Sequence, residues 1–450
     1  MIVQFSVSNF RSFDGEETFS FVASKRLMGQ HDEHTVAIPN SDERVLRAGV
    51  LYGANGAGKS NLFKALHYLQ WLALDTRRAA GTARVPFRFR QGKERATEFD
   101  LQFIAGGRLL RFGLVVDDER VAEEWLIEVV GGREREVYER VSSVEGKTEV
   151  QGKGLAECGP KVELMAKLGG KQHHTFLASV KSLVEATEIL GPVVLALEWF
   201  GSGLVLIGPD ERFGPLGSSL NRDPALKLFA GEFLRAASTG VDGIEVTRKE
   251  IAESVFEQML TRGNQETLAA EVADRDFVVD RQNGLELVKE KGGFYEQEVL
   301  ARHLTNGGEE ALLRLQDESD GTQKLLHLVP ALYDLKQRPA VYVIDEIDRS
   351  LHPMMVRHFV SSFLSACQGG MRQLLVTTHE SRLLDLEILR RDEIWFAEKD
   401  GGLATRLYSL ADFHVRKDLK VDKQYLQGRF GAIPFLSEVK DVAEEVEPVA

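Results

Sequence analysis

The residues from Gly53 to Ser60 read GANGAGKS and restrict the local backbone more tightly than any other part of the chain. They match the pattern G-x-x-x-x-G-K-[ST] at every fixed position, between an apolar run at 47–52 and a segment with apolar residues at helical spacing. Glycine lets a loop pass close to a bound anion, towards which the amides of the loop and of the helix N-terminus point. The pattern therefore predicts a strand, a phosphate-binding loop (P-loop) and a helix.

Two side chains at the end of this pattern carry the chemistry. The ammonium of Lys59 can reach the β- and γ-phosphates of a nucleotide, and the hydroxyl of Ser60 can bind Mg²⁺. ATP and Mg²⁺ are therefore the cofactors that we expect. The nucleotide-binding residues predicted in and just after the loop are Gly53, Asn55, Gly56, Gly58, Lys59, Ser60 and Asn61.

A second apolar run, at residues 340–344, ends in two carboxylates. Its sequence, AVYVI, is typical of a strand buried on both faces of a parallel sheet, and Asp345 and Glu346 follow it directly. Given the upstream loop, we predict that Asp345 binds Mg²⁺ and that Glu346 polarises the water that attacks the γ-phosphate. Residues 373–378 form the predicted parallel neighbour, reached through a helix at 354–367 and a right-handed crossover. His379 follows this neighbouring strand.

A turn with anion-binding features lies between the loop and the acidic strand. Residues 318–323 read ESDGTQ and begin a predicted helix, so Ser319 and the amides after it would face an anion. This motif order resembles that of ABC-type ATPases. Ser319 and Gly321 match the Ser and the second Gly of the LSGGQ signature, whereas Glu318 replaces Leu and Asp320 replaces the first Gly. The resemblance implies that Ser319 caps a nucleotide bound by a second protomer.

Three further segments extend the resemblance. His379 is similar to the switch histidine that contacts the γ-phosphate, and residues 347–353 resemble a D-loop, which implies that Asp348 crosses the dimer interface. The opening SNFRSF, residues 8–13, resembles the N-terminal motif of SMC-type and OLD-type ATPases, which implies that Arg11 lies near the nucleotide. Together with the tail at 425–434, these segments resemble the OLD/RloA-like group of bacterial ABC-type ATPases, which includes the AriA subunit of the PARIS anti-phage system.

The resemblance sets the expected fold and domain organisation. We expect an α/β protein with an ABC-type P-loop ATPase head, a mixed sheet with helices, a β-rich N-terminal lobe and a helical insert. Residues 1–130 would form the N-terminal half of the head with the P-loop, 131–273 the insert, with strands and then mainly helices, and 274–450 the C-terminal half with the other motifs. The 450 residues and 43% apolar content suit such a multi-domain globular chain.

Periodicity predicts the coarse element order. Strands are expected at 2–7 and 17–23 as an opening hairpin, at 99–104 and 109–116 around Gly106 and Gly107, at 124–130, and in the charged stretch 131–154. Helices should dominate 164–265, strands should return after 274, and 309–335 reads as an interrupted helix. For the apolar stretch 191–208 we expect a buried strand pair rather than a membrane span.

Composition narrows the function and the compartment. The net charge of −13 argues against non-specific DNA coating, and two cysteines far apart in sequence suit a reducing cytosol. The N-terminus alternates apolar and polar residues, so we expect no signal peptide, no membrane association and a cytoplasmic location. The chain shows no H-E-x-x-H, Ser/His/Asp or Cys/His signature for a second activity.

The resemblance implies an Mg²⁺-dependent ATPase that hydrolyses ATP at head-to-tail interfaces of a homodimer or higher homo-oligomer. It also implies a sensor or regulator in anti-phage defence, with an effector encoded by a neighbouring gene, a nuclease or toxin, and a phage-encoded trigger. The alternative is an SMC-like DNA-repair or chromosome-handling ATPase that grips duplex DNA. The acidic balance disfavours the alternative and nucleic-acid binding in general.

The sequence does not identify the Q-loop residue, and three further segments are interpreted as having no binding role. Gln91 and Gln102 are weak candidates for the Q-loop residue. Basic residues near aromatics at 88–95 and 416–423 are interpreted as solvated faces rather than as nucleic-acid contacts. The stretch 30–34, QHDEH, has metal-ligand residue types, but an expected loop position without a further ligand disfavours a metal site.

Overall fold

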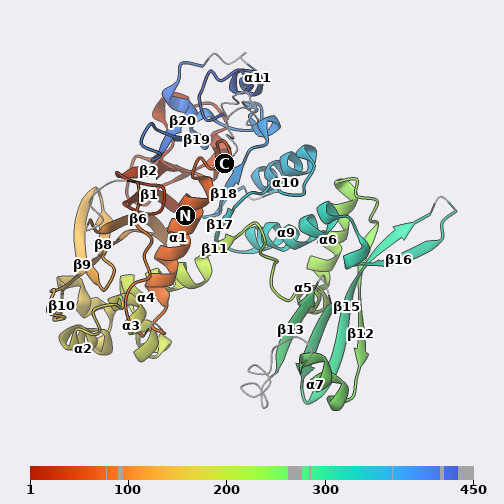
Figure 1. Ribbon diagram of the computed structural model, residues 1–450, viewed down its shortest axis with the longest axis horizontal. Coiled ribbons are helices and arrows are strands. Elements are labelled where there is room, and N and C mark those ends of the chain that lie inside the picture. Colours follow the sequence, from red (N-terminus) through yellow and green to blue (C-terminus); the bar gives the residue numbers. More distant parts are fainter. Residues whose placement is uncertain are drawn as a thin grey trace, which may run out of the picture.

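The computed structural model places four sheets in a central body and a side lobe (Figure 1). It describes residues 1–77, 79–89, 95–261, 276–282, 285–305, 307–366, 368–415 and 420–433. We name the larger sheets the N-terminal sheet, the central sheet and the side sheet. The predicted α/β class with a β-rich N-terminal lobe is confirmed.

The N-terminal sheet is antiparallel, with the strand order β10-β9-β8-β7-β6-β1-β2. The predicted opening hairpin is present, and so is the hairpin around Gly106 and Gly107. These glycines have φ of 54° and 74°, and positive φ at both central residues is what a type I′ turn requires. The strands are β1 (Ile2–Ser8), β2 (Glu17–Ser20), β6 (Thr97–Ala105), β7 (Arg108–Val116), β8 (Val121–Val130), β9 (Arg133–Ser142) and β10 (Thr148–Gln151).

The central sheet carries the nucleotide motifs. Its order is β11-β17-β18-β5-β19-β20, and every neighbouring pair is parallel except β19 with β20. The carboxyl ends of β5, β17 and β18 therefore meet at one edge, where ligands bind in open α/β sheets. The strands are β11 (Leu204–Ile207), β17 (Val341–Ile344), β18 (Gln373–Thr378), β5 (Ala48–Tyr52), β19 (Ile394–Lys399) and β20 (Thr405–Ser409).

The side sheet has the order β12-β15-β14-β13, with β16 pairing β15. Its strands β13 (Phe277–Gln282), β14 (Leu285–Glu290) and β15 (Gly293–Leu304) were expected, but β12 (Gly243–Glu250) and β16 (Glu310–Arg314) were not. The interpretation of 309–335 as an interrupted helix is wrong in its first part, because residues 310–314 extend the ladder of β15. A two-stranded sheet of β3 (Thr35–Ala37) and β4 (Arg44–Leu46) completes the set.

Two helices flank the motif strands, and a third links the central body to the side lobe. Helix α1 (Lys59–Leu74) follows the P-loop, and α10 (Pro353–Ala366) makes the predicted crossover from β17 to β18. Helix α9 (Asp320–Gln337) contacts both α6 and α10, and so lies between the side lobe and the central body (Figure 1). The other α-helices in the described part of the chain are α2 (Pro160–Leu168), α3 (Phe176–Leu183), α4 (Gly191–Glu198), α5 (Leu216–Arg222), α6 (Pro224–Ala236), α7 (Glu253–Thr261) and α11 (Val421–Leu426).

The strand pair expected at 191–208 is wrong. Residues 191–198 form helix α4, with Pro192 in its first turn, and a π-helical segment at Trp199–Gly203 leads into the single strand β11. Proline is favoured at a helix start because its fixed φ suits the helix and its missing N–H is unneeded there. Burial on several sides explains the continuous apolar run, which periodicity alone could not assign.

The central sheet separates two hydrophobic cores. On β5, Leu51 packs into the core that includes α1 and the N-terminal sheet, whereas Val50 and Tyr52 pack into the core that includes α9 and α10. On β17, Val343 and Ile344 divide in the same way. Alternate residues of a strand face opposite sides of the sheet, so the motif strands are buried on both faces.

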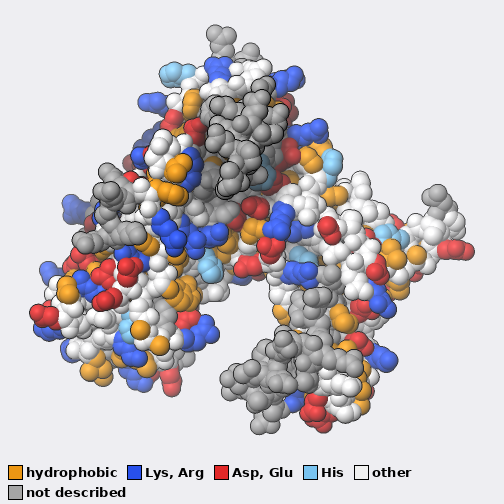
Figure 2. Space-filling view, in the orientation of Figure 1, with side chains coloured by type: hydrophobic (Ala, Val, Ile, Leu, Met, Phe, Trp, Pro, Cys, Tyr) orange, Lys and Arg blue, Asp and Glu red, His pale blue; other side chains and the backbone are white. Residues whose placement is uncertain are grey.

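Figure 2 shows a hollow between the side lobe and the N-terminal lobe, with basic and acidic side chains interspersed over the visible face. Among the described residues, no helix has the length and apolarity needed to cross a membrane. The side sheet contains strands from both sides of the expected domain boundary at residue 273, because β12 lies at 243–250 and β13 begins at 277. The domain boundaries given above stay predictions.

Candidate functional site

The P-loop connects β5 to α1, and two of its glycines cannot readily be replaced. Gly53 has φ of 158°, and a Cβ there would lie 2.5 Å from the carbonyl oxygen of Ala397. Gly58 has φ of 112°, and a Cβ there would overlap the hydroxyl of Thr405. The tip of the loop, at Asn55 and Gly56, is exposed. The loop therefore passes too close to Ala397 and Thr405 for side chains at Gly53 and Gly58, and its tip is exposed to solvent.

Lys59 lies inside this loop and faces three carboxylates. Its Nζ donates to the carbonyl oxygens of Gly53 at 2.7 Å and Ala54 at 3.2 Å, and the residue is only 4% exposed. Burial lowers the pKa of Lys59, while the negative charges of Asp348, Glu346 and Asp345 oppose that shift. The cation of the P-loop and the acidic residues after β17 thus belong to one site.

The structure adds Thr377, which the sequence analysis did not single out. Its hydroxyl donates to Asp345 Oδ1 at 2.5 Å and accepts from the Glu346 amide at 2.8 Å. Asp345 is 1% exposed, and Glu346 has a left-handed φ of 49°. The parallel register pairs Ile344 with Val376, so the residues that follow each of them lie together. The predicted neighbouring strands could have indicated Thr377 by this register.

His379 and Asp348 form a pair at the same edge. The His379 amide donates to Asp348 Oδ2 at 3.2 Å, and its Nε2 lies 3.5 Å from the same oxygen. The His379 side chain is 44% exposed. Asp348 Oδ1 is buried without a hydrogen-bond partner in the described part of the chain. Such an acceptor suits a ligand or an ordered water that would complete the site.

A hydroxyl network joins the N-terminal motif to the P-loop. Asn61 Nδ2 donates to Ser12 Oγ at 2.7 Å, and Thr405 Oγ1 lies 2.8 Å from both Ser12 Oγ and the Ala57 carbonyl oxygen. Ser60 is half-buried in the first turn of α1. Neither Ser12 nor Thr405 was predicted, and for Thr405, which lies 345 residues after Ser60 (405 − 60), the sequence carries no signal.

Arg11 directly precedes this network. It has a left-handed φ of 51°, its amide donates to the Val85 carbonyl at 2.7 Å, and its guanidinium lies 5.5 Å from the centre of the Phe10 ring. Its Nε is buried without a partner among the described residues. Burial and the charge of Arg88 lower the pKa of Arg11. Arg11 is thus held close to the P-loop through its neighbour Ser12.

The signature-like residues lie at the start of α9. Ser319 is exposed and caps the helix, accepting from the Thr322 amide at 3.2 Å. A Cβ on Gly321 would lie 2.9 Å from the Ser350 carbonyl oxygen, so α9 starts against the turn that follows Asp348 in the same chain. Glu318 points elsewhere, because its carboxylate lies 2.6 Å from His303 Nε2. Within the described residues, Ser319 bonds only inside its own first turn.

One further cation lies near Glu346. Lys324 Nζ donates to the Pro209 carbonyl oxygen at 2.9 Å. Burial and the charge of Arg349 lower the pKa of Lys324, whereas Asp210, Glu211 and Glu346 oppose that shift. The sequence analysis did not identify Lys324, because its closeness to Glu346 depends on how α9 packs.

The donor set fits a magnesium nucleotide. Carboxylate and hydroxyl oxygens are hard ligands that suit Mg²⁺, and Asp345, Ser60 and the unpartnered Asp348 Oδ1 supply them at one edge of the sheet. The P-loop amides and the buried Lys59 suit phosphates. Of the Q-loop candidates, Gln102 lies in β6 of the N-terminal sheet and Gln91 falls outside the described residues.

A family model described as "AAA domain, putative AbiEii toxin, Type IV TA system" matches residues 50–155 and 188–385. The chain belongs to this family. The two matched segments include the P-loop, Ser319, Asp345, Glu346 and His379. Membership in this family, together with the P-loop between β5 and α1, assigns the chain to the AAA-type P-loop ATPases.

Solved structures of SMC heads are also similar. The SMC head domain from Thermotoga maritima has 14% identity and a TM-score of 0.38, and covers 92% of this chain and 99% of its own. The Pyrococcus furiosus Smc head with an extended coiled coil, bound to the C-terminal domain of ScpA, has 13% identity and a TM-score of 0.37, and covers 95% and 98%. No curated protein matches the chain.

Proposed function

We propose that the chain hydrolyses MgATP at the edge where β5, β17 and β18 end. The observation that carries this proposal is the position of Lys59, buried in the P-loop and facing the carboxylates of Asp345, Glu346 and Asp348. Gly53, Asn55, Gly56, Gly58 and Asn61 complete the nucleotide-binding set by sequence position.

The proposed roles follow from the chemistry of each group. Lys59 and the P-loop amides would bind the phosphates, and Ser60 with Asp345 would hold Mg²⁺, which would supply positive charge against the phosphates. Glu346 orients and deprotonates the attacking water as a general base. His379, held by Asp348, reaches towards the γ-phosphate. The test is the steady-state rate of ATP hydrolysis, which should fall to background in Glu346→Gln while nucleotide binding persists.

We infer that two copies meet head to tail and that Ser319 of one completes the site of the other. Ser319 is exposed, and its hydroxyl makes its hydrogen bond within its own helix turn, so it is available to a second copy. The resemblance to ABC-type ATPases also supports this arrangement. Lys59→Ala and Ser319→Arg each leave the other residue intact. A mixture of the two variants should therefore regain one competent site per mixed dimer, and no recovery of ATPase activity at any ratio would contradict the trans arrangement.

For the biological role, we propose that the chain acts as a sensor or regulator of a partner effector in anti-phage defence. The resemblance to the OLD/RloA-like group supports it, and the family description names a toxin of a type IV toxin–antitoxin system. The experiment is a pull-down of tagged Glu346→Gln with ATP from cells that carry the native gene neighbourhood. A stoichiometric neighbour-encoded protein is the expected result, whereas nuclease-sensitive DNA alone would favour a DNA-handling ATPase.

A further inference from the structure

A cluster of metal-ligand residues lies in the central body, away from the motifs of the nucleotide site. His31, Glu33 and His34 each bring one ligand atom within 4.8 Å of the other two, and this is the one such group in the part of the chain that the structure describes. These residues precede β3, with Asp32–His34 in a single 3-10 turn. His34 is buried, His31 half-buried and Glu33 exposed.

Both imidazoles have one nitrogen engaged by a group that can only accept. His34 Nδ1 lies 3.1 Å from both carboxylate oxygens of Glu393, which is fully buried, and His31 Nε2 lies 3.1 Å from the Leu386 carbonyl oxygen. A neutral histidine that donates from one nitrogen has a lone pair on the other. These contacts therefore direct His34 Nε2 and His31 Nδ1 as acceptors towards the Glu33 carboxylate.

Two of the three separations between the remaining atoms are close to those of a metal site, and the third is within 4.8 Å. Glu33 Oε1 lies 3.3 Å from His31 Nδ1 and 3.8 Å from His34 Nε2. In a tetrahedral zinc site with bonds of about 2.0–2.2 Å, the ligand atoms lie roughly 3.4 Å apart. Acceptor atoms at this spacing repel one another unless a proton or a metal cation lies between them, and a zinc ion would take the place of the proton in the contacts of Glu33 with the two histidines. A carboxylate behind a ligating histidine, as Glu393 stands behind His34, is the usual outer partner of a zinc-bound imidazole.

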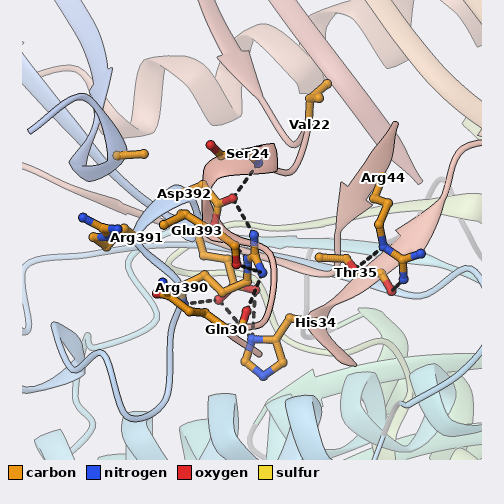
Figure 3. A network of polar contacts seen from close by, with 12 residues as sticks. Val22, Ser24, Gln30, His34, Thr35, Arg44, Arg390, Arg391, Asp392 and Glu393 are labelled. Carbon is orange, nitrogen blue, oxygen red and sulfur yellow. Dashed lines mark hydrogen bonds and ion pairs between the residues drawn. The ribbon is translucent and has the colours of Figure 1, made fainter. Parts of the chain in front are cut away.

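The loop that carries the cluster is held in place by the segment around residues 390–393. Asp392 accepts from the Ser24 amide at 2.8 Å, and the Arg390 guanidinium donates to the Gln30 carbonyl (Figure 3). On the other side, Arg47 Nε donates to the Glu33 carbonyl at 3.1 Å. Hydrogen bonds to the backbone on both sides of the cluster thus hold the ligand residues in place, which gives a pre-organised site.

We propose that His31, Glu33 and His34 bind one Zn²⁺ ion, with the fourth position open to water. Imidazole nitrogen with a single carboxylate suits zinc rather than magnesium or calcium, which prefer oxygen ligands alone. The ion would join the segment before β3 to the segment around Leu386 and Glu393, which precedes β19. The sequence analysis disfavoured a metal site at 30–34 because of its expected loop position and the lack of a further ligand, and it could not foresee the outer partners Leu386 and Glu393, which lie more than 350 residues further along the chain.

The test measures zinc retained by tag-free protein after dialysis, by elemental analysis, and zinc affinity by competition with a chromophoric chelator. The background carries Asp345→Asn, so that the magnesium site does not contribute. We expect one zinc per chain, and binding at least about 10-fold weaker in His31→Ala and in Glu33→Gln, the order of loss typical even for outer partners. His31 and Glu33 are not buried, so both variants should fold, which thermal unfolding checks.

His67→Ala is the matched control, because His67 is exposed on α1. Its zinc affinity should equal that of the parent. Cobalt loaded in place of zinc should give the visible absorption of a tetrahedral site in the parent and in His67→Ala, but not in His31→Ala. Equal zinc binding by His31→Ala and His67→Ala, or no zinc retained by the parent, would overturn the proposal.

Discussion

At the scale of single residues, Thr377 connects the Asp345 carboxylate to the backbone of Glu346. Its one hydroxyl fixes the Asp345 side chain and the Glu346 backbone, and Glu346 adopts a left-handed φ of 49° that non-glycine residues rarely occupy. Backbone strain of this kind persists only where its surroundings hold it, and it often occurs at functional sites. The orientation of Glu346 should therefore depend on Thr377.

We predict that Thr377→Val lowers ATP turnover more than it lowers nucleotide affinity. Valine keeps the shape but removes both hydrogen bonds, one of them to a charged group, which costs about 1–3 kcal/mol in the free energy of unfolding. Steady-state ATPase rates and chemical denaturation measure the two effects. Thr377→Ser keeps the hydroxyl and should retain most of the turnover. Full activity in Thr377→Val would show that Asp345 and Glu346 hold their positions without it.

At the scale of elements, the hairpins and motif strands could be predicted, because their patterns are local. The loop from Gly53 to Ser60 and the alternating strands lie where the sequence indicates. Strand β12 could not be predicted, since long-range pairing with β15 determines it. Strand β16 forms a local hairpin with β15, but its residues also suit a helix. In the site, Lys59 and Asp345 follow from motifs, whereas Ser12, Thr405 and Lys324 depend on packing between distant segments.

The turn into α1 gives a prediction about Gly58. Alanine there would meet a left-handed φ of 112° and overlap the Thr405 hydroxyl, so Gly58→Ala should destabilise the fold by about 1–3 kcal/mol and abolish nucleotide binding. Denaturation and a fluorescent-nucleotide titration measure these effects. Gly29→Ala is the control, because Gly29 has φ of 81° but its Cβ would meet nothing within 4 Å. Equal nucleotide binding by the two variants would contradict the close approach at Gly58.

Helix α9 contains a buried histidine that should make stability depend on pH. Burial, with smaller effects from Arg212 and Lys324, lowers the pKa of His327 from 6.5 to about 4. Between these values the unfolded chain binds more protons than the folded chain, so stability is full above pH 6.5 and is lost as the pH falls towards 4. This loss amounts to about 2 kcal/mol between pH 7 and pH 5.

The measurement is chemical denaturation of the parent and of His327→Leu at both pH values. Leucine cannot titrate, so the parent should lose about 2 kcal/mol more than the variant over this range. Carboxylates elsewhere affect both proteins alike and cancel in the comparison. Parallel pH profiles would show that folding does not lower the pKa of His327.

At the scale of the whole molecule, ATP binding should control self-association. Lys59 contacts its own P-loop, whereas Ser319 is exposed and satisfied within α9, so each chain holds complementary parts of the proposed composite site. Glu346→Gln should accumulate as a dimer with MgATP and as a monomer without it, as measured by light scattering after size-exclusion chromatography. Ser319→Arg in the same background should stay monomeric. A dimer that forms equally with and without nucleotide would contradict this control.

The segment that connects the side sheet to α9 is very short. Strand β16 ends at Arg314, the 3-10 turn Leu315–Asp317 follows, and Ser319 caps the helix directly afterwards. No slack remains in this connection to absorb a rotation of the side lobe. In the proposed head-to-tail dimer, a rotation of the side lobe would therefore move the start of the helix that carries Ser319, and a molecule bound to this lobe would change the alignment of the two copies without entering the nucleotide site.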